Sequence, residues 1–94
     1  MDEWMFAIGR AYVAVPALEG AKRHLVVCVG RKGRVVQLVW AEDLSIEASK
    51  VYDYGREMIR ASRPDGVFTI SAACPVDTES AADVIACFQG RKAV

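Results

Sequence analysis

The sequence contains no asparagine, a single histidine (His24), and three cysteines, none of which forms a Cys-x-x-Cys pair. These shortages exclude the usual ligand spacing of a zinc site and the motif of thioredoxin-type redox proteins. We therefore expect no metal and no cofactor. Unpaired cysteines at wide spacing are typical of reduced thiols, so we expect a cytoplasmic protein.

The chain also lacks a long apolar segment and an excess of charge of one sign. No run approaches the roughly 18 apolar residues of a membrane-spanning helix, and the first ten residues carry acids where a secretory signal begins with positive charge. The 12 Lys and Arg residues balance 12 Asp and Glu residues, so bulk positive charge cannot hold the chain on nucleic acid. We expect no membrane partner.

What remains is the composition of one small globular domain, residues 1–94, with 53% hydrophobic and 26% charged residues. Residues 10–41 predict an antiparallel meander, beginning with a strand over 10–16. Two apolar runs joined by Arg-Lys-Gly-Arg then predict a hairpin with its turn at Lys32-Gly33 or over residues 31–34. Either turn pairs the same residues on one apolar face: Val29 with Val36, Val27 with Leu38, and Leu25 with Trp40.

The second half of the chain predicts helix, strand and helix. Residues 43–62 carry apolar and small side chains at helical spacing, a strand is predicted over 67–74, and a second helix over 78–89. Residues 1–9 fit either an N-terminal arm or a short helix. The expected fold class is α+β, with a small mixed sheet of three or four strands and helices packed mainly on one face.

Such a sheet would have a second apolar face, which one layer of helices cannot cover. The N-terminal segment, the last helix or another protein chain could cover it. Our leading hypothesis is therefore a small non-catalytic protein-interaction or assembly module that self-associates, with a homodimer or another protein chain as its partner. The residues expected on the interaction face are Val26, Val35, Val39 and Val67.

The basic turn of the hairpin gives an alternative hypothesis. Arg31, Lys32 and Arg34 surround Gly33 at the end of a projecting hairpin, where they could contact phosphates. The alternative function is thus a nucleic-acid-binding accessory protein. No aromatic residue interleaves with these cations in the sequence, so the hairpin by itself lacks a surface on which bases could stack.

The sequence contains no catalytic constellation, and this favours a protein that is not an enzyme. Cys74 is the one candidate for a reactive thiol, because it lies between a predicted strand and the start of a predicted helix, whose positive pole would favour a thiolate. The same position also suits a small buried apolar side chain.

Overall fold

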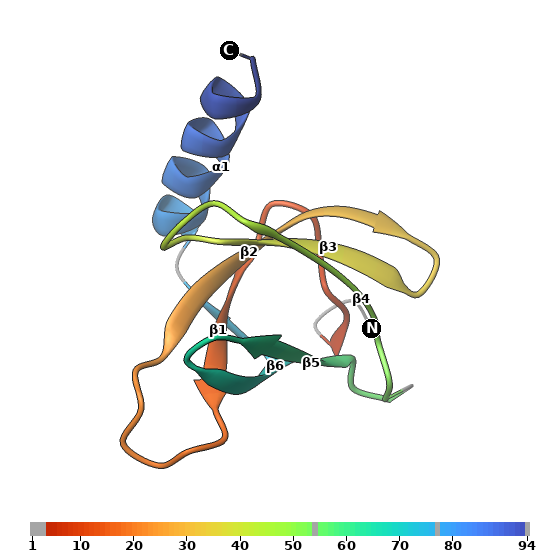
Figure 1. The fold of residues 1–94 in the computed structure, drawn as a ribbon. Coiled ribbons are helices and arrows are strands. Elements are labelled where there is room, and N and C mark those ends of the chain that lie inside the picture. Colours follow the sequence, from red (N-terminus) through yellow and green to blue (C-terminus); the bar gives the residue numbers. More distant parts are fainter. Residues whose placement is uncertain (1–3, 54, 77, 94) are drawn as a thin grey trace.

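The computed structural model describes residues 4–53, 55–76 and 78–93. These residues form six β-strands and one α-helix (Figure 1). In chain order the elements are β1 (Ala11–Pro16), β2 (His24–Lys32), β3 (Val35–Trp40), β4 (Ile46–Lys50), β5 (Met58–Arg63), β6 (Gly66–Val76) and α1 (Thr78–Ala93).

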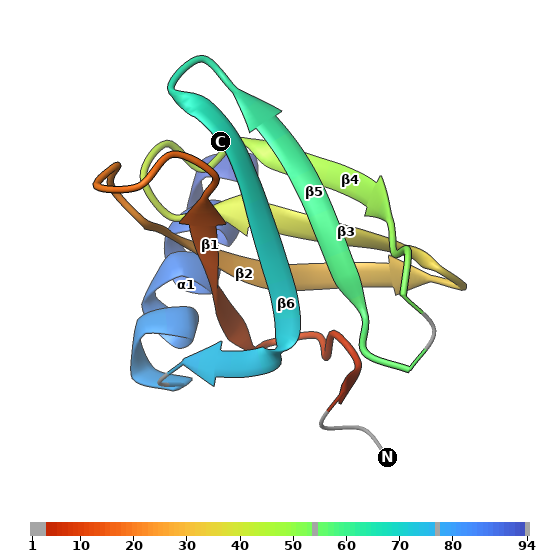
Figure 2. The same cartoon turned by 90° about the horizontal axis from the view of Figure 1, so that it is seen from below.

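The strands make one antiparallel sheet in the order β4-β3-β2-β1-β6-β5. The sheet coils until its two edge strands meet, and the backbone N–H of Tyr52 donates to the carbonyl of Met58 at 3.1 Å where β4 ends and β5 begins. Figure 2 shows the result as a flattened barrel, in which β5 and β6 cross over β2 and β3. The barrel is nearly closed, with a seam between β4 and β5.

The hydrophobic core fills the inside of this barrel. Tyr12, Leu38, Trp40 and Phe68 are among its fully buried side chains, and Phe6 from the N-terminal segment packs edge-on against Tyr12 at 4.9 Å between ring centroids. A second, smaller cluster lies outside the barrel, where Ala81 of α1 packs against Ala11 and Val27. Val84 and Ile85 of α1 extend this cluster, so the helix covers the outer face of β1 and β2.

The α+β prediction is wrong, because the chain forms a six-stranded, wholly antiparallel barrel instead of a mixed sheet of three or four strands covered by helices. The helix predicted over residues 43–62 is also wrong, since that segment contains β4, a connection and β5. Alternation along β5 places Ile59 and Ala61 in the core. The helical spacing of apolar residues over 43–62 is accidental, because the loop between the two short strands offsets their apolar positions in the sequence. Strand pairing with β3 and β6 overrides the weak local preference.

The predicted hairpin forms, but its register is wrong. Lys32 pairs with Val35 across a two-residue turn, in which Gly33 has the positive φ of 60° that the first position of a type II′ turn requires. A bulge between Cys28 and Gly30 then shifts the pairing again. As a result Val26 faces Trp40 and Cys28 faces Leu38, and the face of β2 that seemed to need an external cover lies inside the barrel.

The N-terminal residues 4–10 contain no strand and run across one end of the barrel, while residues 1–3, which the arm-or-helix prediction included, lie outside the described residues. α1 occupies the region of the last predicted helix and points its C-terminal end away from the barrel (Figure 1). No helix in the described part of the chain has the length and apolarity needed to cross a membrane.

Candidate functional site

The barrel has two ends, which we name by β2: the hairpin end, where β2 turns into β3, and the His24 end, where β2 begins. Arg31 lies at the hairpin end but does not project from it. Its guanidinium forms two parallel hydrogen bonds, of 2.6 and 2.5 Å, with the carboxylate of Glu57. The Glu57 side chain is 7% exposed and that of Arg31 is 20% exposed, so this part of the predicted nucleic-acid contact is an internal ion pair. The hydrogen bonds from Arg31 lower the pKa of Glu57 although burial opposes this.

The other two predicted contacts, Lys32 and Arg34, are exposed. Lys32 pairs with Val35, and Val35 pairs in turn with Lys50, so the three side chains lie in one outward row across β2, β3 and β4. The carbonyl of Arg34 accepts a hydrogen bond from the N–H of Val51 at 2.9 Å, which places the turn beside the end of β4.

Two exposed aromatic side chains join these cations. Tyr52 follows β4 and is 47% exposed, and the guanidinium of Arg60 lies 5.8 Å from its ring centroid. Trp4 in the N-terminal segment is 36% exposed, and the guanidinium of Arg56 lies 4.8 Å from its ring. In each contact the guanidinium lies over one face of the ring, so stacking of a base is limited to the exposed part of the other face. We call the whole set the basic surface: Trp4, Lys32, Arg34, Lys50, Tyr52, Arg56 and Arg60.

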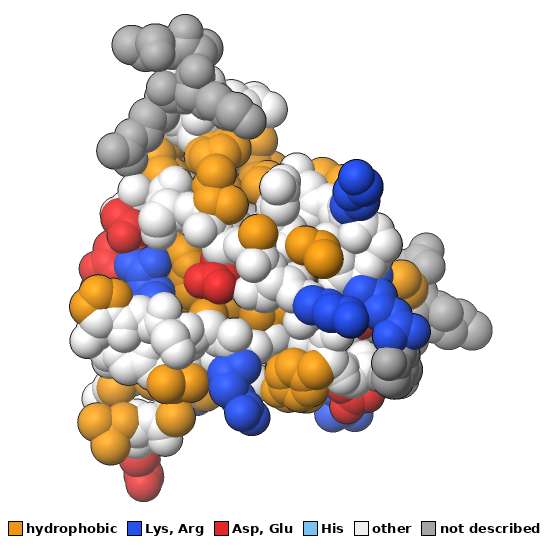
Figure 3. All heavy atoms as spheres, turned by 45° about the vertical axis from the view of Figure 1, so that its right-hand side comes forward, with side chains coloured by type: hydrophobic (Ala, Val, Ile, Leu, Met, Phe, Trp, Pro, Cys, Tyr) orange, Lys and Arg blue, Asp and Glu red, His pale blue; other side chains and the backbone are white. Residues whose placement is uncertain are grey.

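The basic surface contains little negative charge among the described residues. Asp53 is its one exposed carboxylate there, and its Oδ1 accepts hydrogen bonds from the N–H groups of Gly55 and Arg56, which shape the loop between β4 and β5. A shallow pocket of about 300 Å³ lies between Trp4, Asp53 and Arg56. Figure 3 shows this side of the molecule, with blue Lys and Arg side chains gathered around orange hydrophobic ones.

The His24 end has a different character. The His24 side chain is 4% exposed, its Nδ1 lies 3.1 Å from Glu42 and its Nε2 lies 2.8 Å from Asp65. The ring also packs edge-on against Trp40 and Phe68. Both ring nitrogens of this buried side chain face carboxylates, and these contacts join the start of β2 to Glu42 and Asp65. The hydrogen bond from His24 lowers the pKa of Asp65.

Arg63 completes this end of the barrel. Its guanidinium lies 4.2 Å from the Trp40 ring and donates to Asp43 at 2.9 Å and to the hydroxyl of Ser45 at 3.1 Å. These contacts join β5 to the turn before β4 and so hold one end of the seam. Hydrogen bonds from Ser45, and then from Arg63, hold the pKa of Asp43 well below its usual range. Among the described residues, no group of three or more His, Cys, Asp or Glu side chains could hold a metal ion.

The structure does not bring the predicted interaction face together. Val26 is fully buried inside the barrel, and Val39 is also fully buried, so neither side chain is available to a partner. Val35 and Val67 are each 42% exposed but lie on different strands, β3 and β6, which are not neighbours in the sheet. Cys74 lies in β6, and its side chain is outside the described part of the structure.

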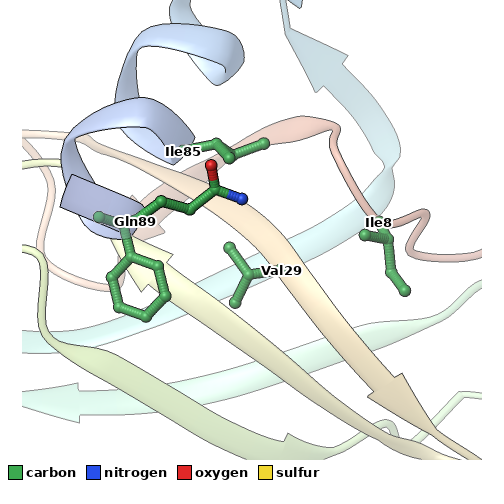
Figure 4. A pocket seen from close by; sticks show the side chains of 5 residues that line it. Ile8, Val29, Ile85 and Gln89 are labelled. Carbon is green, nitrogen blue, oxygen red and sulfur yellow. The ribbon is translucent and has the colours of Figure 1, made fainter. Parts of the chain in front are cut away.

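An apolar groove lies outside the barrel between α1, β2 and the N-terminal segment. Its volume is about 260 Å³, and Figure 4 shows Ile85 and Gln89 of α1 on one side with Val29 and Ile8 opposite; Phe88 is the remaining lining residue. Ile8 is 64% exposed at the rim of this groove. The periodicity of the last helix gave no indication of it, because the groove depends on how α1 meets β2.

The nucleic-acid contact expected from the sequence included Lys32 and Arg34 but none of the other residues of the basic surface. Lys50, Tyr52, Arg56 and Arg60 lie in the segment predicted to be a helix, whose sequence KVYDYGREMIR does alternate cations with aromatic residues. That interleaving was the available signal. Trp4 carried no signal of its own, because only the folded N-terminal segment brings it beside Arg56.

No family model, curated protein or solved structure matches this chain. The functional interpretation therefore depends on the geometry of the two barrel ends.

Proposed function

We propose that this protein is a non-catalytic nucleic-acid-binding protein that holds single-stranded RNA or DNA on the basic surface. The observation that carries the proposal is the convergence of exposed cations and two exposed aromatic rings from separate segments at the hairpin end. Proteins that bind single strands combine a positive track for the phosphates with aromatic side chains on which bases stack. Free thiols at Cys28 and Cys87 support our placement of this binding in the cytoplasm.

A formal net charge of zero is compatible with this function because the described part of the basic surface carries five cations, Lys32, Arg34, Lys50, Arg56 and Arg60, against one exposed carboxylate, Asp53. The opposite end is mixed in sign: its exposed acids include Glu42 and Asp65, and Lys22 and Arg23 are exposed cations there. These acids lie near the His24 end, the length of β2 away from Lys32. At physiological salt, charges farther apart than about 8 Å are largely screened from each other, so a phosphate at the hairpin end meets a locally positive surface.

A titration with labelled single strands of roughly 12 nucleotides, and with the matched duplex, tests the proposal at about 50 and 200 mM salt. We expect salt-sensitive binding that favours the single strand. The double variant Lys32→Gln with Lys50→Gln should reduce the slope of log K against log salt by about 1.4, because each lost phosphate contact on a single strand removes about 0.7.

The matched control is Lys22→Gln with Arg23→Gln, which removes the same charge from exposed residues near the His24 end. This variant should bind as the wild type does. Asp53→Asn removes the exposed carboxylate of the basic surface and should strengthen binding. Equal losses in the two double variants, or no salt-sensitive binding by the wild type, would overturn the proposal.

An anionic membrane surface is the competing ligand for a basic surface with exposed aromatic residues. Vesicles of phosphatidylcholine with phosphatidylserine, tested by co-sedimentation, distinguish the two. Binding to these vesicles without binding to single strands would assign the surface to lipid and reject the nucleic-acid proposal.

Self-association is a second candidate function, and the apolar groove beside α1 is the observation that favours it. The exposed residues of α1 include the small or apolar Ala82, Ala86 and Cys87 beside the polar Asp83 and Gln89. A second copy could pack these against the groove, although closure of the barrel removes the uncovered sheet face that first suggested assembly. Sedimentation velocity at micromolar concentration tests this, and a single species with the mass of one chain would reject it.

A further inference from the structure

The N-terminal segment is held at the hairpin end through its backbone on both sides of Met5. The N–H of Glu57 donates to the carbonyl of Trp4 at 3.0 Å, and Glu57 Oε1 accepts a hydrogen bond from the N–H of Phe6 at 2.8 Å. Arg31 Nη1 also donates to the carbonyl of Phe6 at 3.3 Å. Glu57 and Arg31 therefore fix the segment that carries the Trp4 ring.

The pair reaches these groups because it is buried at the point where three segments meet. Arg31 comes from β2 and Glu57 from the loop before β5. Phe6 comes from the N-terminal segment, and its side chain is 2% exposed because it packs inside the barrel. Another backbone bond, from the N–H of Ala72 to the carbonyl of Glu57 at 3.0 Å, anchors the loop to β6. A carboxylate that accepts from Arg31 and from a backbone N–H together is oriented more strictly than one in a surface ion pair.

Trp4 lies beside the loop between β4 and β5, whose Arg56 contacts its ring. Trp4 shares its shallow pocket with Asp53, the residue that follows Tyr52 in the chain, and with Arg56. The buried Phe6 side chain anchors the N-terminal segment in the barrel, and the backbone contacts to Glu57 hold residue 4 at this loop.

We propose that Trp4 is a second stacking position for the single strand and that Arg31 and Glu57 are the positioning residues that hold it there. This inference depends on the proposed function. It also defines the ligand further: a strand long enough to reach both Tyr52 and Trp4 gains from two stacked bases, whereas a shorter strand gains from one.

Binding of a long and a short homopolymeric single strand, roughly 12 and 4 nucleotides, tests the stacking position. Trp4→Ala should weaken binding of the long strand by about 5- to 150-fold, the range expected for one lost stack, and Trp4→Phe should restore most of it. The preference of the wild type for the long strand should shrink in Trp4→Ala. Arg34→Gln serves as the comparison, because it should weaken binding through charge and leave the contribution of Trp4 unchanged.

Glu57→Gln tests the positioning role, since the amide keeps the shape of the side chain but loses the ion pair. Trp40 is 1% exposed, so quenching of fluorescence by iodide reports on Trp4. We expect Glu57→Gln to change iodide quenching and to weaken binding of the long strand, and we expect no further weakening when it is combined with Trp4→Ala. Far-ultraviolet circular dichroism establishes that each variant is folded, and Arg31→Lys is the substitute if Glu57→Gln is not.

The outcomes separate this inference from the proposed function. If the wild type binds single strands, Tyr52→Ala weakens binding and Trp4→Ala does not, then the proposed function stands and the second stacking position is rejected. If Trp4→Ala weakens binding but Glu57→Gln leaves binding and quenching unchanged, the positioning role is rejected. If the wild type binds no single strand, both proposals fail.

Discussion

The two ends of the barrel differ in how deeply the acidic partners of β2 are buried. Each end places a cationic or ionisable side chain of β2 among acidic partners: Arg31 with Glu57 at the hairpin end, and His24 with Glu42 and Asp65 at the other. The carboxylate side chain is 7% exposed at the hairpin end, but about half exposed at the His24 end, at 51% and 52%. From this difference between the carboxylates we expect that removing the acidic partner costs more stability at the hairpin end than at the His24 end.

The largest effect should follow from Glu57→Ala. This change leaves the Arg31 guanidinium partly buried without its counter-ion and removes the acceptor of the Phe6 N–H. We expect a loss of about 3 kcal/mol in the free energy of unfolding, measured by urea denaturation, because breaking a buried pair strands a charge. The double variant Arg31→Met with Glu57→Leu should recover part of this loss. A loss as small as that of an exposed ion pair would contradict the importance of depth.

A smaller effect should appear when the pH falls. The pKa of Glu57 is lowered in the folded protein, chiefly by hydrogen bonds from Arg31, so the unfolded chain takes up a proton at a higher pH than the folded one. The stabilisation is therefore complete above the usual glutamate range and is lost as pH falls through the folded-state pKa. Unfolding midpoints measured from neutral pH into this acidic range should decline, and the decline should be shallower in Glu57→Gln. Equal slopes would show that Glu57 is not the titrating group.

The smallest effect should come from Asp65→Asn at the His24 end. The hydrogen bond from His24 lowers the pKa of Asp65, so its contribution too is present above the usual aspartate range and lost as pH falls. Because this carboxylate is half exposed, water replaces most of what the change removes. Asp65→Asn should therefore shift the urea midpoint at neutral pH far less than Glu57→Ala does. A shift of similar size would mean that the two ends are energetically alike.

The sequence predicted the local elements better than their arrangement. The strand before Pro16, the hairpin strands and the last helix occupy the expected regions, because each has its own periodicity or turn residue. The register of the hairpin depended on a bulge at Val29, which no local preference indicates, and one shifted residue exchanged the inner and outer faces. β4 and β5 are short and rich in Ala, Ser, Arg and Lys, so only their partners make them strands.

The candidate site was predictable to the same extent. Lys32 and Arg34 lie beside and in a turn and are exposed, as a contact on the surface requires, and their contact with nucleic acid stays a prediction. Arg31 was assigned to the same contact, and it points inward because of the strand register. The pairs Tyr52–Arg60 and Trp4–Arg56 form only through tertiary structure, since Tyr52 follows β4, Arg60 lies in β5 and Trp4 lies in the N-terminal segment. The segment KVYDYGREMIR contains both cations and aromatic residues, but only the fold places Trp4 beside this segment.

The seam between β4 and β5 is where the hydrogen-bonded order of the described strands does not close. Its described contacts concentrate at its ends, with Tyr52 and Met58 at one and Arg63 with Asp43 at the other. Tyr52 and Arg60 lie on opposite sides of that seam, so a ligand that contacts both side chains would link β4 to β5. Slower exchange of the amide hydrogens of β4 and β5 would then accompany occupancy, even where the ligand touches neither strand's backbone.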